Sequence, residues 1–180
     1  FMLCDHLWGT IVRGNDWLTC IGRLTFPIYA FLLVEGYFHT KNLKKYVCRL
    51  LLFAVISEIP FNLAMASSII YPFHQNVLWS FLIAIGLIRW NEKGKEKQIW
   101  KRILIGIATI GIGYIVGILT FVDYYNAGIL MVLVFYFFRG NKWWNYLGQL
   151  VCLWYINFEM LGGLQYEIPL FGQTCFFTRQ

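Results

Sequence analysis

Charged side chains are scarce in this sequence. Asp, Glu, Lys and Arg make up 13% of its 180 residues, whereas a soluble domain usually carries about 25%. A soluble domain has to cover its core with polar side chains, and a chain that is 59% hydrophobic has too few of them. The same apolar surplus excludes a disordered chain. The composition therefore predicts a polytopic membrane protein.

Several common site motifs are also absent. The chain has no P-loop, dinucleotide-binding glycine fingerprint, HExxH or CxxC motif. Its three histidines are scattered, which is a poor arrangement for zinc. The cysteines are odd in number and have neither close pairing nor metal-ligand spacing, which argues against a disulfide-stapled module; they are Cys4, Cys20, Cys48, Cys152 and Cys175.

Long apolar runs separated by short polar loops predict the membrane spans. The runs cover residues 1–12, 22–38, 46–70, 76–90, 103–121, 125–138 and 145–162, and residues 168–177 are interpreted as a re-entrant piece or a truncated eighth span. A spanning helix needs about 20 residues, and the lack of strict alternation excludes a barrel. We expect an all-α, polytopic transmembrane helical bundle with about seven visible spans. It would form a single integral membrane domain over residues 1–180, incomplete at one or both ends.

Basic residues set the predicted orientation. Twelve of the 15 lie in or beside the loops after the second, fourth and sixth runs, in three groups: Lys41, Lys44, Lys45 and Arg49; Arg89, Lys93, Lys95, Lys97, Lys101 and Arg102; Arg139 and Lys142. These loops would face the cytoplasm, and the turns near residues 14–21, 71–75 and 122–126 would face outward. The net charge of +6 is thus a topology signal, and no basic face remains for a nucleic acid.

One stretch, residues 91–102, is strongly hydrophilic. The simplest interpretation is a solvated cytoplasmic loop. Two further interpretations are a contact with anionic lipid and a docking site for a phosphorylated cofactor.

Ionisable residues inside the apolar runs need a reason to be there, because a charge within a bilayer costs roughly 2.5–3.5 kcal/mol. Asp5 and His6 are adjacent in the first run. His6 is the best candidate for a general base, since an unperturbed histidine has a pKa of about 6.5 and a buried carboxylate can hold its tautomer. The alternative is a polar pair that joins two helices.

The second run carries Arg23 near its outer end and Glu35 and His39 near its inner end. Glu35 and His39 are four residues apart, so they share one helix face. They form either an edge pair without chemistry or, through His39, part of a site for a cofactor phosphate beside Lys41.

The third run contains Ser57, Glu58 and Pro60 near its middle. Proline removes a backbone hydrogen bond, and broken helices with polar side chains at the midplane often mark binding sites. This pattern predicts either a broken helix that presents Glu58 to a site or a simple kink satisfied by Ser57.

Two predicted outer turns hold further candidates. Asn76 is interpreted first as a helix N-cap and second as a ligand. Asp123 and Tyr124 precede the sixth run. Asp123 either caps that helix or faces the outer mouth of a site.

Together these residues resemble the TraX family of bacterial inner-membrane proteins, named for the member that acetylates the amino terminus of conjugative pilin. The resemblance covers residues 2–138 and departs from the family pattern after them. It rests on Asp5-His6, Arg23 to Pro27, FLLVEGYFHT over residues 31–40, Arg49, SEIPF over residues 57–61, Asn76-Val77 and Asp123-Tyr124. More remotely, the family is similar to multispan membrane acyltransferases.

The resemblance implies an acetyltransferase of the inner membrane that uses cytoplasmic acetyl-CoA. His6 would be the general base, and Arg23 would stabilise the oxyanion or pair with Glu58 or Asp5. Asp5, Glu35 and Glu58 would orient His6 or hold Arg23. The cofactor-binding residues would be His39, Lys41, Lys44, Lys45 and Arg49 with Glu35, and the substrate-binding residues Asn76, Asp123 and Tyr124.

The expected partners are membrane lipid and an acceptor with an amine or a hydroxyl group, on a pilin-like peptide, a glycan or a small molecule. The alternative is a non-enzymatic protein, either a transporter or an assembly partner for a surface structure. A transporter should show repeated halves with matching broken helices. The sequence has one such segment, at Glu58 to Pro60, which favours the enzyme.

Overall fold

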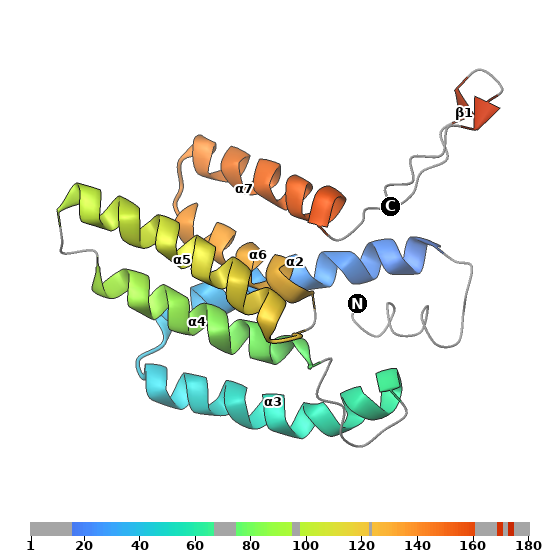
Figure 1. The fold of residues 1–180 in the computed structure, drawn as a ribbon, viewed down its shortest axis with the longest axis horizontal. Helices are drawn as coiled ribbons and strands as arrows, with labels where there is room; N and C mark the ends of the chain where they lie inside the picture. Colours follow the sequence, from blue (N-terminus) through green and yellow to red (C-terminus); the bar gives the residue numbers. More distant parts are fainter. Residues whose placement is uncertain are drawn as a thin grey trace.

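The structure is a computed structural model that describes residues 16–66, 75–94, 98–122, 124–160, 169–170 and 173–174. Most of these residues are helical (Figure 1). The elements are α2 (Asp16–His39), α3 (Leu43–Ala66), α4 (Val77–Lys93), α5 (Ile99–Leu119), α6 (Tyr125–Phe137), α7 (Trp143–Tyr155), a short π-helical continuation of α7 (Ile156–Met160), and the strands β1 (Pro169–Leu170) and β2 (Gln173–Thr174).

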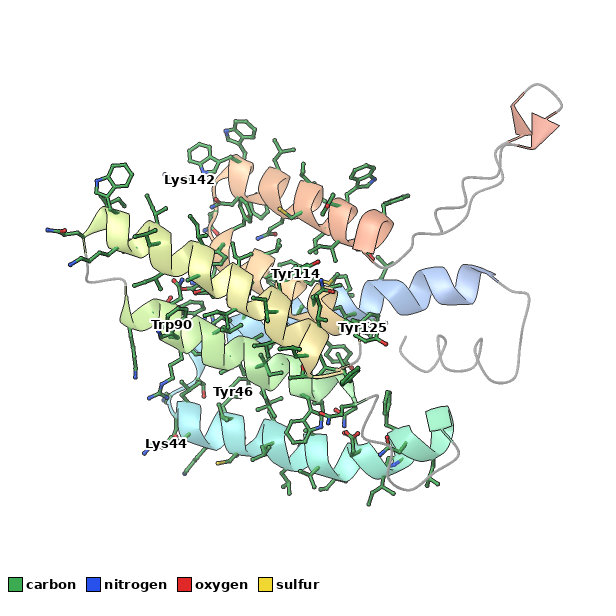
Figure 2. All side chains as sticks on the ribbon, in the orientation of Figure 1. Lys44, Tyr46, Trp90, Tyr114, Tyr125 and Lys142 are labelled. Atoms are coloured by element: carbon green, nitrogen blue, oxygen red, sulfur yellow. The ribbon has the colours of Figure 1, made fainter. Side chains whose placement is uncertain are left out.

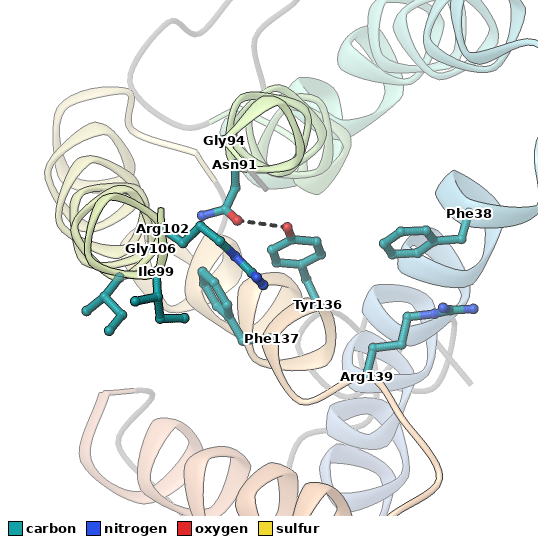
Figure 3. A pocket seen from close by; sticks show the side chains of 10 residues that line it. Phe38, Asn91, Gly94, Ile99, Arg102, Gly106, Tyr136, Phe137 and Arg139 are labelled. Atoms are coloured by element: carbon teal, nitrogen blue, oxygen red, sulfur yellow. Dashed lines mark hydrogen bonds between the residues drawn. The ribbon is translucent and has the colours of Figure 1, made fainter. Parts of the chain in front are cut away.

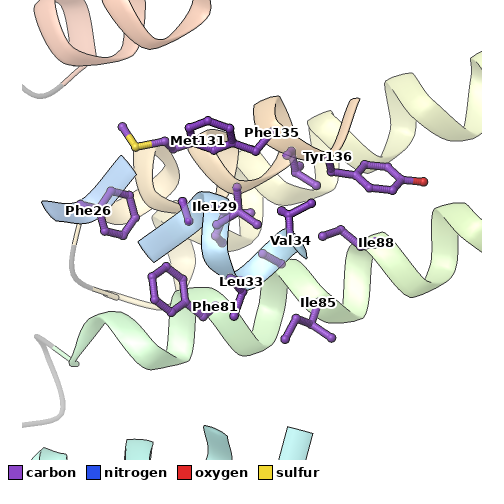
Figure 4. Packing of buried hydrophobic residues seen from close by; sticks show 14 of the residues in the cluster. Phe26, Leu33, Val34, Phe81, Ile85, Ile88, Ile129, Met131, Phe135 and Tyr136 are labelled. Carbon is purple, nitrogen blue, oxygen red and sulfur yellow. The ribbon is translucent and has the colours of Figure 1, made fainter. Parts of the chain in front are cut away.

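The 13-residue helix α6 forms the centre of the bundle. It is apolar on every side, and a helix of that kind is stable only when it is surrounded. Eight of its residues are buried, and it packs against α2, α4, α5 and α7. Phe26, Val34, Phe81 and Ile88 from α2 and α4 complete the core around it (Figure 4).

The outer helices expose apolar side chains instead of polar ones. The stretches Leu43–Leu63 of α3 and Ile99–Leu119 of α5 are each long and apolar enough to cross a membrane. Only 11% and 17% of their most apolar windows are buried within the protein. Large apolar side chains such as Phe53 and Leu104 therefore face outward, as expected of a surface covered by lipid.

Successive helices run in opposite directions, so the predicted cytoplasmic loops lie at one end of the bundle and the predicted outer turns at the other. The C-terminal ends of α2, α4 and α6 and the N-terminal ends of α3, α5 and α7 lie together, at the left of Figure 1. Lys44 and Lys142 mark this end, which we call the basic end (Figure 2). At the opposite end, the Gln75 N–H donates to the Phe121 carbonyl at 3.0 Å. The structure thus confirms that the basic loops share one end.

Six of the predicted runs each correspond to one helix, which confirms the all-helical fold apart from the two short strands. Of these helices, α3 and α5 meet the length and composition of a span by themselves. The first run, residues 1–12, lies outside the described residues. In the segment 168–177, interpreted as a re-entrant or eighth span, the four described residues pair as antiparallel strands. This ten-residue segment is too short to span a membrane, and Pro169 and Gly172 make it a poor helix former.

The predicted break at Pro60 is corrected by the structure, because α3 continues through it as one helix. The Ser57 hydroxyl donates to the carbonyls of Phe53 at 2.6 Å and Ala54 at 3.3 Å. Both carbonyls precede the one that Pro60 leaves without its N–H donor, so the predicted relief of a kink by Ser57 is also wrong.

Candidate functional site

A pocket of about 400 Å³ lies at the basic end, between the ends of four helices (Figure 3). Its volume is typical of small-molecule sites. Its lining combines apolar and aromatic side chains with two guanidinium groups. The lining residues are Phe38, Asn91, Gly94, Ile99, Arg102, Ile103, Gly106, Tyr136, Phe137 and Arg139.

A hydrogen-bonded network fixes the inner wall of this pocket. The Tyr136 hydroxyl oxygen lies 2.9 Å from Asn91 Oδ1 and 2.7 Å from Glu92 Oε1, so these two acceptors share its single proton. The Asn91 amide donates to Thr109 Oγ1 at 3.0 Å, and the Thr109 hydroxyl donates to the Ile105 carbonyl at 2.7 Å. Because Thr109 and Asn91 are buried, these bonds hold α4, α5 and α6 in a defined register around the pocket.

Arg139 is fixed at the pocket by two neighbours on α2. Its Nε lies 2.7 Å from Glu35 Oε1 and its Nη2 lies 3.2 Å from Glu35 Oε2, a bidentate pair. Its guanidinium carbon also lies 4.3 Å from the centre of the Phe38 ring. The hydrogen bonds that Arg139 donates to Glu35 raise the pKa of Arg139, so this residue is a permanently charged and oriented donor.

Arg102 reaches the pocket from the first turn of α5. That turn contains no acidic residue, and Arg102 forms no ion pair with any described residue. Figure 3 shows its side chain extending toward Tyr136 and Phe137, while Arg139 lies beside Phe38. Among the described residues, the pocket thus has one guanidinium group with an ion-pair partner and one without.

The six predicted cofactor-binding residues lie at this end but do not line the pocket. Glu35 and His39 do share a helix face, and the His39 ring donates from Nδ1 to the Glu35 carbonyl at 2.8 Å. Glu35 contributes to the site indirectly, through Arg139. The other four are exposed on the α2–α3 connection and the first turns of α3: Lys41, Lys44, Lys45 and Arg49.

Glu58 belongs to a second polar cluster, nearer the opposite end. Its Oε2 accepts hydrogen bonds from the Trp79 indole at 3.1 Å, from the Asn76 backbone N–H at 3.4 Å and from the Asn76 side-chain amide. Asn76 Oδ1 accepts from the Leu78 N–H at 3.0 Å, which confirms the predicted N-cap of α4. The cluster therefore joins α3 to the start of α4.

Tyr124, a predicted substrate-binding residue, precedes α6 in the left-handed conformation, with φ 61°. Its ring stacks on Phe26 with centroids 4.6 Å apart. Asp5, His6 and Asp123 lie outside the described residues. Arg23 falls within α2, and its side chain lies outside the described part of the structure.

Sequence reasoning did not single out Asn91, Arg102, Tyr136 or Arg139. The stretch 91–102 had been interpreted in one alternative as a docking site for a phosphorylated cofactor, and it does supply Asn91 and Arg102 to the pocket. The available signal for Arg139 was its place in the third basic loop, directly after an apolar run.

Comparisons with known proteins identify a family and a relative that this chain resembles. The family model described as "TraX protein" matches residues 1–173. A segment of 61 residues, 32% of this chain, is 44% identical to the "Probable fimbrial assembly protein FimC, serogroup H1" of Dichelobacter nodosus. The matching segment spans 25% of the length of that protein. No solved structure matches the chain significantly.

Proposed function

The chain belongs to the TraX family, and on that premise we propose that it is a multi-pass enzyme of the bacterial inner membrane that transfers an acetyl group from cytoplasmic acetyl-CoA to an amine or hydroxyl acceptor. The observation that carries the proposal is the pocket at the basic end, which combines two arginines with an apolar and aromatic lining. The positive-inside rule assigns this end to the cytoplasm, where acetyl-CoA is found.

The chemistry requires one proton transfer. The acceptor nitrogen or oxygen attacks the thioester carbonyl, the carbon–sulfur bond breaks, and CoA leaves. His6 takes the proton from the acceptor and returns it to the leaving thiolate, so that CoA departs as a thiol. Arg23 stabilises the oxyanion of the tetrahedral intermediate, and Asp5 and Glu58 orient these two groups.

The relative from Dichelobacter nodosus suggests the setting of the reaction. Its printed name refers to fimbrial assembly, and fimbriae are built from pilin-like subunits. A peptide with a free amino terminus, such as that of a pilin-like subunit, is therefore the first acceptor to test, followed by glycans and small molecules.

The test uses the whole protein purified in detergent, acetyl-CoA labelled in its acetyl group and a synthetic peptide with a free amino terminus. We expect time-dependent labelling of the peptide by the natural protein. The His6→Ala variant should insert normally and bind acetyl-CoA, but it should transfer no label. Full activity of this variant would remove His6 from the mechanism.

A second candidate is a non-enzymatic role in the assembly of a surface structure, which the name of the relative favours. This candidate predicts neither acetyl-CoA binding nor transfer by the whole protein. It also predicts that a strain without the protein loses surface fibres, while the mass of the fibre subunits is unchanged.

A further inference from the structure

We infer that the pocket at the basic end is an anion site, in which Arg102 and Arg139 bind the phosphate groups of the acyl donor in place of the lysine-rich loop. This inference rests on the proposed function for the identity of the donor. The anion-binding chemistry itself rests on the geometry of the pocket.

The two arginines differ from the other basic residues of this end. All four side chains are exposed, but Arg102 and Arg139 line the pocket, whereas Lys44 and Lys45 do not. Guanidinium groups bind phosphate oxygens in a fixed fork, which a lysine ammonium cannot reproduce. The pocket arginines are therefore better suited to select a phosphorylated ligand than the loop lysines are.

Arg139 is oriented before any ligand arrives. Glu35 accepts hydrogen bonds from the Nε–H and one Nη2–H of Arg139, and the Phe38 ring lies against the guanidinium. Three of the five N–H donors of a guanidinium are left for a ligand. Glu35 thus acts as a positioning residue, which fixes the direction of those donors and reduces the entropy that binding has to remove.

Arg102 provides a positive charge that no described carboxylate neutralises, whereas Glu35 partly neutralises the charge of Arg139. Arg102 makes no ion pair with any described residue, and it extends toward Tyr136 in the pocket. The nearby carboxylate of Glu92 accepts from the Tyr136 hydroxyl at 2.7 Å. A ligand with phosphates and an apolar arm would place its phosphates at the arginines and its arm along Phe38, Phe137 and Ile103.

The test compares two donors with the same acetyl thioester. Acetyl-CoA carries phosphates, and acetyl-pantetheine does not. We expect calorimetry on the whole protein in detergent to give at least about tenfold tighter binding of acetyl-CoA, since a charge-assisted hydrogen bond contributes about that much or more. Arg102→Gln and Arg139→Gln should each remove about tenfold or more of the acetyl-CoA affinity and leave acetyl-pantetheine binding unchanged.

Matched controls remove the same charge beside each arginine. Lys101→Gln neighbours Arg102 and Lys142→Gln lies close to Arg139 in the sequence, and neither lysine lines the pocket. These variants should bind both donors as the natural protein does. Arg102→Gln also breaks no ion pair among the described residues, and an unchanged Tm would show that its loss of affinity does not reflect misfolding.

Three results would separate the outcomes. Equal losses in the arginine variants and their lysine controls, or a larger loss in Lys44→Gln with Lys45→Gln, would overturn the pocket assignment and leave the proposed function intact. If the natural protein binds no acetyl-CoA but binds pyrophosphate in a manner that requires Arg102 and Arg139, the anion site stands and the proposed function fails. Binding of neither probe would overturn both.

Discussion

Gly117 of α5 lies so close to Asn126 of α6 that a Cβ atom on the glycine would clash with Asn126 Cα and stand 2.8 Å from its backbone nitrogen. No side-chain rotation relieves a contact with backbone atoms. We expect Gly117→Ala to lower the free energy of unfolding by about 1–3 kcal/mol, as overpacking does in cores. Thermal unfolding in detergent measures this as a lower Tm.

The control for this prediction is on the same helix. Gly111 has no atom within 4 Å of the position of an added Cβ, and alanine is a better helix former than glycine by roughly 0.5–1 kcal/mol. Gly111→Ala should therefore keep or raise the Tm. Similar losses in both variants would show that α5 and α6 do not approach at Gly117 as described.

The pair of Glu35 and Arg139 should show energetic coupling. Their side chains are 27% and 38% exposed, so solvent screens the interaction and we expect no more than on the order of 1 kcal/mol. In a cycle of Glu35→Gln, Arg139→Gln and the double variant, the double variant should cost less than the sum of the single ones. Exactly additive losses would mean that the two groups do not interact in solution.

Tyr136→Phe should destabilise the bundle, because it removes the hydroxyl that donates toward Asn91 and Glu92. Asn91 is buried, and an unsatisfied buried polar group costs about 1–3 kcal/mol. Tyr146 on α7 is 52% exposed and serves as the control, since Tyr146→Phe should leave the Tm unchanged. An unchanged Tm in Tyr136→Phe as well would show that the network contributes nothing to stability.

Glu58 offers a way to separate stability from catalysis. Glu58→Ala leaves the N–H groups of Asn76 and Trp79 without their acceptor and should cost about 1–3 kcal/mol. Glu58→Gln keeps an acceptor oxygen and should cost less. If Glu58 takes part in acetyl transfer, both variants should lose activity despite their different Tm values. A fully active Glu58→Gln variant would limit Glu58 to joining α3 and α4.

The helices could be predicted from sequence because each apolar run ends at a polar loop. The boundaries were less accurate where tertiary contacts extend a helix beyond its apolar run. The fourth run was expected to end at residue 90, but α4 continues to Lys93. The added turn contains Asn91 and Glu92, whose side chains both contact Tyr136. Hydropathy contains no information about such contacts.

The pocket was only partly predictable for a similar reason. Charge counting placed the basic residues at one end of the bundle, which the structure confirms. It could not distinguish the lysines outside the pocket from the arginines that line it, because that difference depends on which helix ends adjoin. Glu35 was expected to pair with His39, four residues away, and its carboxylate does lie 3.4 Å from the His39 ring. Its bidentate partner, Arg139, is 104 residues away and was not predicted.

Because Glu35 and Arg139 are far apart in the sequence, the ribosome synthesises them at different times. In the proposed orientation α2 is made well before α6, and at roughly 5–20 residues per second Arg139 follows Glu35 out of the ribosome some 5–20 s later. Until Arg139 is synthesised, the Glu35 carboxylate has His39 beside it, and water at the cytoplasmic edge can solvate it at little cost. The ion pair of Glu35 and Arg139 can therefore form only after α6, which directly precedes Arg139, has been synthesised.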